Sequence, residues 1–134
     1  MVTCRILIVD DDRDDLDLLC SSFHEIGVKE IHAVESVQEA IEFLQNADDK
    51  KELPKLIVTD LNMPGQCGYE LLKFLKTTPL YMHIPVIIFS TSISEKEIKK
   101  SLSLGALDYI PKPILIEDYI DLVSKMNKRI TGDY

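Results

Sequence analysis

The sequence has no tryptophan, only five glycines and no long apolar stretch among its 134 residues. None of its apolar runs approaches the roughly 20 residues that a membrane-spanning helix requires. The N-terminal residues lead directly into a short apolar run and a block of acids, unlike the long apolar core of a signal peptide. We therefore expect a cytoplasmic protein without a membrane partner.

Basic side chains are scarce: 15 lysines and arginines stand against 23 aspartates and glutamates, which gives a net charge of -8. Proteins that bind nucleic acids directly need a basic surface. Direct binding to nucleic acid is therefore not expected.

Cysteine and histidine are too few and too scattered to indicate a disulfide framework or a transition-metal site. The cysteines are odd in number and lack C-x-x-C spacing, which predicts reduced, partly buried thiols. The histidines do not cluster as metal ligands would. The residues concerned are Cys4, Cys20, Cys67, His24, His32 and His83.

Short apolar runs alternate with helical patterns five times along the chain. The runs typical of buried strands lie at residues 5–9, 30–34, 56–59, 86–89 and 108–110. Apolar residues at helical spacing follow at residues 14–26, 36–44, 68–76, 94–102 and 115–130. The last helix is expected to bury Ile116, Ile120, Val123 and Met126.

This alternation predicts an α/β fold, a doubly wound five-stranded parallel sheet of order 2-1-3-4-5 with five helices on its two faces. Capping-box patterns mark two of the helix starts, at Ser36 and Ser94. No linker or repeat interrupts the pattern, so residues 1–134 are expected to form a single domain.

Acids follow two strands that lie side by side in this topology. Asp10 and Asp11 come directly after the first strand and Asp60 after the third, so the three carboxylates are expected to converge. Such a cluster needs a cation or raised pKa values, and oxygen ligands select Mg²⁺, with Mn²⁺ as the alternative. The first turn, D-D-D-R-D-D, has no glycine, which argues against a phosphate-cradling dinucleotide loop.

The fourth strand ends at a hydroxyl, Ser90, and the fifth is followed by a cation, Lys112. An acid pair, a nucleophilic aspartate, a hydroxyl and a lysine form a set suited to phosphoryl transfer. The other acids near the first turn are interpreted as residues that favour the helix dipole and not as ligands. These are Asp12, Asp14 and Asp15.

Four motifs together resemble the receiver domain of two-component response regulators over essentially the whole chain. They are I-L-I-V-D-D-D at 6–12, V-T-D-L-N-M-P-G at 58–65, P-V-I-I-F-S-T at 85–91 and G-A-L-D-Y-I-P-K-P at 105–113. Each motif is weak alone, but their order and spacing are specific. The resemblance implies a flavodoxin-like, CheY-like fold of the stand-alone type.

The resemblance assigns the metal and the acceptor. Asp60 matches the phosphoacceptor, Asp11 a direct Mg²⁺ ligand and Asp10 an acid that acts mostly through water. Asn62 matches the residue whose backbone carbonyl binds the metal.

The resemblance also assigns the switch. Ser90 matches the hydroxyl that bonds a phosphoryl oxygen, and Lys112 the cation that pairs with another such oxygen or with Asp60. Tyr109 matches the aromatic residue that moves inward when the hydroxyl shifts. Pro113 stands where the family has a cis Lys-Pro bond. The departures are modest: Thr91 replaces a common alanine, and Cys67 a common aspartate.

By this resemblance the chain takes a phosphoryl group from a histidine kinase or a histidine phosphotransferase and turns over no external substrate. Its output is expected from the surface of the fourth helix, fifth strand and fifth helix, through a downstream protein or a homodimer, or from relaying the phosphoryl group onward. The loop at 46–54 and the start of the fourth helix resemble stand-alone receivers, including some paired with phytochrome-type kinases.

Three other interpretations fit part of the pattern. A haloacid-dehalogenase-type phosphatase shares the Asp, Ser/Thr, Lys and Mg²⁺ set, but its nucleophile follows the first strand and it normally carries a cap. A flavodoxin-like binding domain has no use for the acid cluster. A degenerate receiver used only for docking would not need all five site positions.

Overall fold

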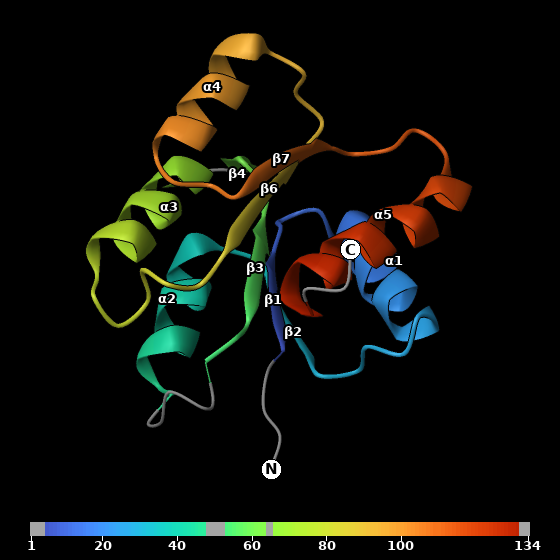
Figure 1. The fold of residues 1–134 in the computed structure, drawn as a ribbon, viewed down its shortest axis with the longest axis horizontal. Coiled ribbons are helices and arrows are strands. Elements are labelled where there is room, and N and C mark those ends of the chain that lie inside the picture. Colours follow the sequence, from blue (N-terminus) through green and yellow to red (C-terminus); the bar gives the residue numbers. More distant parts are fainter. Residues whose placement is uncertain (1–4, 48–52, 64–65, 132–134) are drawn as a thin grey trace.

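The computed structural model describes residues 5–47, 53–63 and 66–131. Five strands form one parallel sheet of order β2-β1-β3-β6-β7 (Figure 1). They are β1 (Ile6–Val9), β2 (Ile31–Val34), β3 (Leu56–Thr59), β6 (Val86–Ser90) and β7 (Asp108–Pro111). Because β6 and β7 are the fourth and fifth strands of this sheet in chain order, the expected order 2-1-3-4-5 is confirmed.

Five α-helices cover the two faces of the sheet: α1 (Arg13–Glu25), α2 (Val37–Gln45), α3 (Gly68–Thr77), α4 (Glu95–Ser103) and α5 (Tyr119–Thr131). Helices α2, α3 and α4 lie on one face, and α1 and α5 pack together on the other (Figure 1). Side chains of β1 alternate between the two cores. Leu7 and Val9 pack with α2 and α3, whereas Ile6 and Ile8 pack with α1 and α5.

Local capping explains where the helices begin and end. Asp12 caps α1 by accepting the Asp15 N–H, and Ser36 caps α2 by accepting the Glu39 N–H at 3.0 Å. Gly27 follows the end of α1, and its φ of +93° is easily adopted only without a Cβ atom. In the described part of the chain, no helix is both long and apolar enough to cross a membrane.

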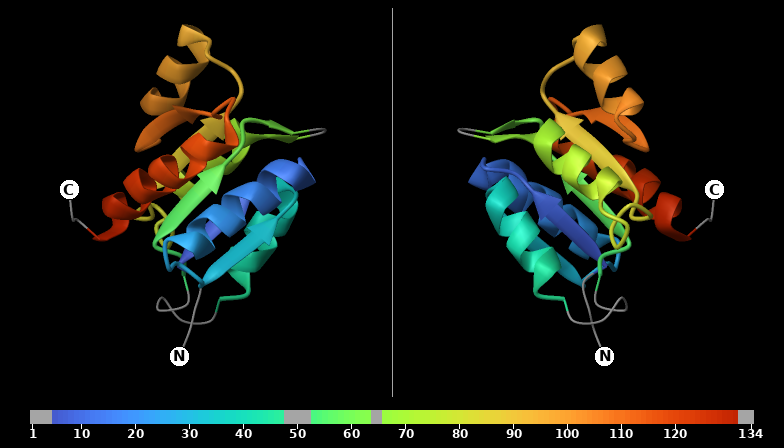
Figure 2. Two further views of the ribbon diagram at one scale, coloured as in Figure 1. Left: turned by 90° about the vertical axis from the view of Figure 1, so that its right-hand side faces the viewer. Right: turned by 90° about the vertical axis from the view of Figure 1, so that its left-hand side faces the viewer.

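The connection after β3 differs from expectation. A small antiparallel ribbon of β4 (Asn62–Met63) and β5 (Gln66–Cys67) replaces the expected loop after β3 and projects from the sheet (Figure 2). Pro64 and Gly65, expected as loop residues, lie outside the described residues. Cys20 and Cys67 are free, partly buried thiols as expected, and Cys4 is also outside the described ranges.

The last helix begins later than predicted, and the expectation that Ile116 and Ile120 are buried is wrong. A 3-10 turn, η2 (Ile116–Asp118), precedes α5 and changes the phase of the side chains. Ile116 is 70% exposed and Ile120 36%, whereas Tyr119 is only 3% exposed. Val123 and Met126 are fully buried as predicted.

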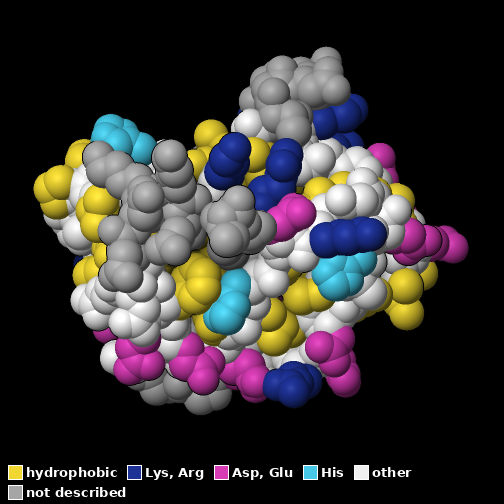
Figure 3. All heavy atoms as spheres, turned by 90° about the horizontal axis from the view of Figure 1, so that it is seen from below, with side chains coloured by type: hydrophobic (Ala, Val, Ile, Leu, Met, Phe, Trp, Pro, Cys, Tyr) yellow, Lys and Arg dark blue, Asp and Glu magenta, His cyan; other side chains and the backbone are white. Residues whose placement is uncertain are grey.

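The candidate site residues lie at one end of the sheet only. Figure 3 shows the amino end, where acidic, basic and histidine side chains are interspersed with apolar ones. The polar residues singled out from the sequence lie at the opposite, carboxyl end, where the loops after β1, β3, β6 and β7 come together.

Candidate phosphoacceptor site

Asp10, Asp11 and Asp60 converge at the carboxyl edge of the sheet, as expected. The register pairs Val9 of β1 with Thr59 of β3, and the Asp60 N–H donates to the Val9 carbonyl at 2.9 Å. One carboxylate oxygen from each of the three aspartates lies within 4.8 Å of the others. Asp10 and Asp60 are buried and Asp11 is exposed, so the cluster opens to solvent on the side of Asp11.

Lys112 projects into this cluster from the loop after β7. Its N–H donates to the Ser90 carbonyl at 2.8 Å, which extends the pairing of β6 with β7 beyond Pro111. The Lys112 Nζ lies 2.8 Å from Asp10 Oδ2, 2.8 Å from Asp15 Oδ2 and 3.4 Å from Asp60 Oδ2. The lysine side chain is only 6% exposed, so these carboxylates replace its hydration.

The electrostatics of the cluster combine burial with close charge pairs. Burial raises the pKa of the Asp10 carboxyl group to about 6, although hydrogen bonds from Lys112 and the Asp12 N–H act in the opposite direction. Burial lowers the pKa of Lys112, but its hydrogen bonds to Asp10 and Asp15 outweigh that effect and raise the pKa above its ordinary value. Lys112 is therefore cationic at neutral pH, and burial makes the charged form of Asp10 depend on nearby cationic and hydrogen-bonding partners.

The Asp60 carboxylate is held at both oxygens. The Leu61 N–H donates to Oδ1 at 2.7 Å, and Lys112 contacts Oδ2. The start of α3 lies against the same backbone, where the Gly68 N–H donates to the Leu61 carbonyl at 2.8 Å. A Cβ atom on Gly68 would lie 2.4 Å from the Asp60 carbonyl oxygen, so only glycine fits there.

Ser90 and Tyr109 are both buried and are linked through Ser92. The Ser92 N–H donates to Ser90 Oγ at 3.3 Å, and the Tyr109 hydroxyl donates to the Ser92 carbonyl at 2.8 Å. The sequence suggested that Tyr109 moves inward when Ser90 shifts. In this structure the Tyr109 side chain is buried, and its hydroxyl is bonded to the loop after β6; the movement itself stays a prediction.

The geometry bears on two further sequence expectations, although the role of the Asn62 backbone carbonyl as a metal ligand stays a prediction. Asn62 lies in β4 with an exposed side chain, so its identity is not fixed by packing. The expected cis bond between Lys112 and Pro113 is absent, since the described residues contain no cis peptide. The trans form is favoured by about 0.5–1 kcal/mol at X-Pro bonds, and with it Lys112 already reaches its carboxylate partners.

The family model of the response regulator receiver domain matches residues 6–124. The chain belongs to the response regulator receiver family. Two-component response regulator ORR13 of Oryza sativa subsp. japonica is 37% identical to it over 118 residues, which cover 88% of this chain and 93% of that protein. The receiver is therefore a phosphoacceptor response regulator of two-component signalling, a family that interacts with histidine kinases or phosphotransferases.

Solved structures of response regulators have the same fold as this chain. The phosphorylated cyanobacterial phytochrome response regulator RcpA matches with a TM-score of 0.86 at 28% identity, covering 99% of this receiver and 97% of that chain. The Mn²⁺-bound form of response regulator Rcp1 matches with a TM-score of 0.80 at 28% identity, covering 93% and 92%. Receiver domains bind a divalent metal ion, and the acidic cluster of this receiver offers three carboxylate oxygens to such an ion.

The sequence reasoning missed one member of the site. Asp15 was interpreted only as an acid at a helix N-terminus, yet its carboxylate also pairs with Lys112. The signal was topological, because a helix that follows β1 begins at the same edge of the sheet where the loop carrying Lys112 ends.

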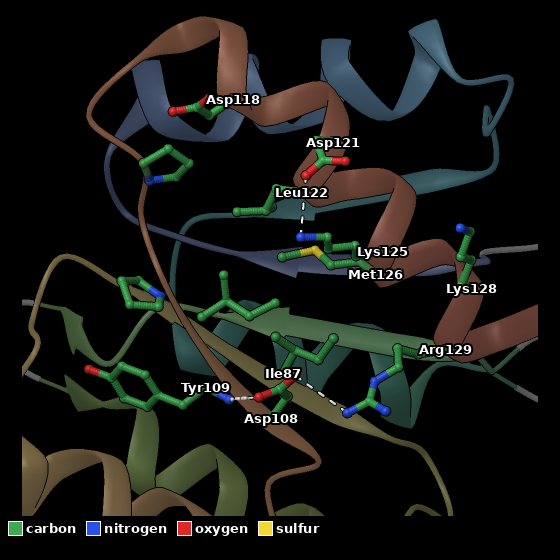
Figure 4. A pocket seen from close by; sticks show the side chains of 13 residues that line it. Ile87, Asp108, Tyr109, Asp118, Asp121, Leu122, Lys125, Met126, Lys128 and Arg129 are labelled. Atoms are coloured by element: carbon green, nitrogen blue, oxygen red, sulfur yellow. Dashed lines mark hydrogen bonds and ion pairs between the residues drawn. The ribbon is translucent and has the colours of Figure 1, made fainter. Parts of the chain in front are cut away.

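A groove of about 680 Å³ lies on another part of the receiver, between β7 and α5 (Figure 4). Arg129 of α5 reaches across it to Asp108 of β7, at 3.4 Å, and Lys125 pairs with Asp121 along the helix (Figure 4). Ile87 and Met126 are among its apolar lining residues. Tyr109 also lines the groove, and its hydroxyl donates to the Ser92 carbonyl in the loop after β6.

Proposed function

We propose that Asp60 is the residue that accepts the phosphoryl group, and that Mg²⁺ is held by Asp10, Asp11, Asp60 and the backbone carbonyl of Asn62. The observation that carries this proposal is the convergence of three carboxylate oxygens within 4.8 Å beside Lys112. All the donors are oxygens, which suits Mg²⁺ or Mn²⁺. Asp10 is buried, so its carboxylate is stabilised by a nearby cation.

In the proposed step, an Asp60 carboxylate oxygen attacks the phosphorus of a phosphohistidine on the donor. A P–O bond forms, the P–N bond breaks, and its electron pair returns to the imidazole nitrogen. The Leu61 N–H keeps the carboxylate oriented, and Lys112 donates to a phosphoryl oxygen. A bound Mg²⁺ supplies charge neutralisation for the transferring phosphoryl oxygens.

The proposed output follows from the Ser92 link. A phosphoryl oxygen that accepts a hydrogen bond from Ser90 draws this hydroxyl toward Asp60. Ser92 bonds to Ser90 through its N–H and to Tyr109 through its carbonyl, so a shift of Ser90 changes what holds Tyr109. The surface of α4, β7 and α5, including the groove at β7 and α5, is where a downstream protein or a second copy would respond.

The test is intact mass spectrometry after incubation with acetyl phosphate and Mg²⁺. The wild-type protein is expected to gain one phosphoryl group that hydroxylamine removes, and a chelator is expected to prevent the gain. Asp60→Asn is expected to show no gain, whereas the matched control Asp14→Asn behaves as wild type. A labile adduct that persists in Asp60→Asn, or multiple turnover of a phosphomonoester, would show that the proposal is wrong.

A further inference from the structure

Lys112 has one carboxylate partner more than the proposed phosphoryl transfer uses. Asp10 and Asp60 belong to the metal and acceptor cluster, whereas Asp15 comes from the first turn of α1. Asp15 Oδ2 lies 2.8 Å from Lys112 Nζ, as close as Asp10 and closer than Asp60 at 3.4 Å. The contact joins residues 97 positions apart, so it is a product of the fold and not of local sequence.

The position of Asp15 is fixed by the start of the helix. Asp12 accepts the Asp15 N–H at 3.1 Å through its Oδ1, and the Asp12 N–H donates to Asp10 Oδ1 at 2.9 Å. The first turn of α1 is thereby tied to the acidic cluster. Asp15 consequently reaches Lys112 from a helical turn whose start is held by hydrogen bonds.

Asp15 also differs from the other two partners in solvent exposure. Its side chain is 30% exposed, compared with 5% for Asp10 and 10% for Asp60. A divalent cation at the cluster would attract the Asp10 and Asp60 oxygens and repel the nearby Lys112 ammonium group. Asp15 is the partner that remains available to Lys112 under those conditions.

We propose that Asp15 is a positioning residue that holds the Lys112 ammonium group beside Asp60 while a cation occupies the cluster. It acts on phosphoryl transfer only through Lys112. This inference rests on the proposed role of Asp60 as phosphoacceptor, but the pairing of Asp15 with Lys112 can be tested separately.

The first arm of the test detects the ion pair without any phosphoryl donor. In the Mg²⁺-loaded wild-type protein, the buried and hydrogen-bonded ammonium group of Lys112 is expected to give a protected NH₃⁺ signal in ¹H–¹⁵N NMR spectra. Asp15→Ala is expected to lose this signal by fast exchange with water. Asp14→Ala, a change at an exposed residue on the same helical turn, is expected to retain it.

The second arm measures the rate of phosphorylation by acetyl phosphate at saturating Mg²⁺. Asp15→Ala is expected to slow the reaction about 5-fold, the effect of losing one ion pair whose carboxylate is partly exposed to solvent. Asp14→Ala is expected to leave the rate unchanged. In a Lys112→Met background, Asp15→Ala is expected to cause no further loss, because its effect passes through the lysine.

The outcomes separate the two proposals. Failure of the wild-type protein to form an adduct refutes the role of Asp60, while the NMR arm still decides the pairing. The inference about Asp15 is overturned if Asp15→Ala keeps both the Lys112 signal and the wild-type rate. It is also overturned if Asp15→Ala slows the reaction equally with Lys112 and with methionine at that position.

Discussion

At Asp10, burial favours the neutral carboxyl group, whereas the neighbouring Lys112 ammonium group favours the charged carboxylate. Asp10 is enclosed by the core, accepts a hydrogen bond from the Asp12 N–H and pairs with Lys112, yet it lies within 4.8 Å of two further carboxylates. Burial dominates and raises its pKa to about 6. A protein optimised only for stability would not place a carboxylate there, which is consistent with a site prepared for a cation.

This shift predicts an unusual pH dependence of the metal-free protein. Because the pKa of Asp10 is raised from 3.8 to about 6 in the folded state, its contribution to stability is full below 3.8 and is lost as pH rises through about 6. Lowering the pH from 7 to 5 should therefore add about 1 kcal/mol to the free energy of unfolding through this group. Urea denaturation with a chelator present, at both pH values, measures the change.

The matched variant for this measurement is Asp10→Asn, which keeps the shape of the side chain but does not titrate. Its unfolding free energy should lack this increase, whereas Asp14→Asn should retain it. Parallel pH profiles for wild type and Asp10→Asn would contradict the assigned cause.

At the scale of elements, the site depends on how the start of α3 packs against the end of β3. Gly68 opens α3, and its missing Cβ atom leaves room for the Asp60 carbonyl oxygen. The nearest atoms are backbone, which cannot give way as the end of a flexible side chain could. The geometry of Asp60 is thus set by an adjacent helix as well as by its own strand.

Gly68→Ala is accordingly expected to destabilise the fold by about 1–3 kcal/mol, the usual cost of overpacking, and to slow phosphorylation of Asp60. Gly27→Ala is the matched control, because it strains a position with positive φ at the end of α1, where a Cβ atom meets nothing within 4 Å. Both variants should lower the urea midpoint, but only Gly68→Ala should slow phosphorylation by acetyl phosphate. Equal rates in the two variants would show that Asp60 does not depend on this contact.

At the scale of the molecule, two cores on opposite faces of one sheet hold the carboxyl-edge loops in place. The loop after β6 connects the candidate site to α4 and β7 through the backbone of Ser92. The Tyr109 hydroxyl is bonded to the Ser92 carbonyl of this loop, so the position of Tyr109 depends on the loop that also contacts Ser90. Phosphorylation is then expected to shift populations and not to rebuild the fold.

Ser90→Ala tests this coupling. The variant should still be phosphorylated at Asp60 but should show a smaller change of amide exchange in α4, β7 and α5, because the hydroxyl that links the phosphoryl group to Ser92 is missing. Coupling energies of this kind are typically about 1–3 kcal/mol, enough for a measurable change in exchange protection. Ser103→Ala, at the exposed end of α4, is the control.

Hydrogen–deuterium exchange with and without acetyl phosphate and Mg²⁺ makes the comparison. If the changes in the wild-type protein are confined to the loops around Asp60, the output role of this surface is wrong, and a relay role becomes the better explanation.

The order of the five sheet strands and five α-helices, the sheet order and the meeting of Asp10, Asp11 and Asp60 could be predicted from the amino-acid sequence alone. These follow from local periodicity, from helix caps such as Ser36, and from the rule that parallel strands end at one edge. Tertiary structure decided the rest. The pairing of Asp15 with Lys112, the closeness of Gly68 to Asp60 and the bond from Tyr109 to the loop after β6 depend on distances between segments remote in the chain, which no local pattern encodes. Ile116 is exposed because it lies in a 3-10 turn that precedes α5. This turn places Tyr119, and not Ile120, in the core.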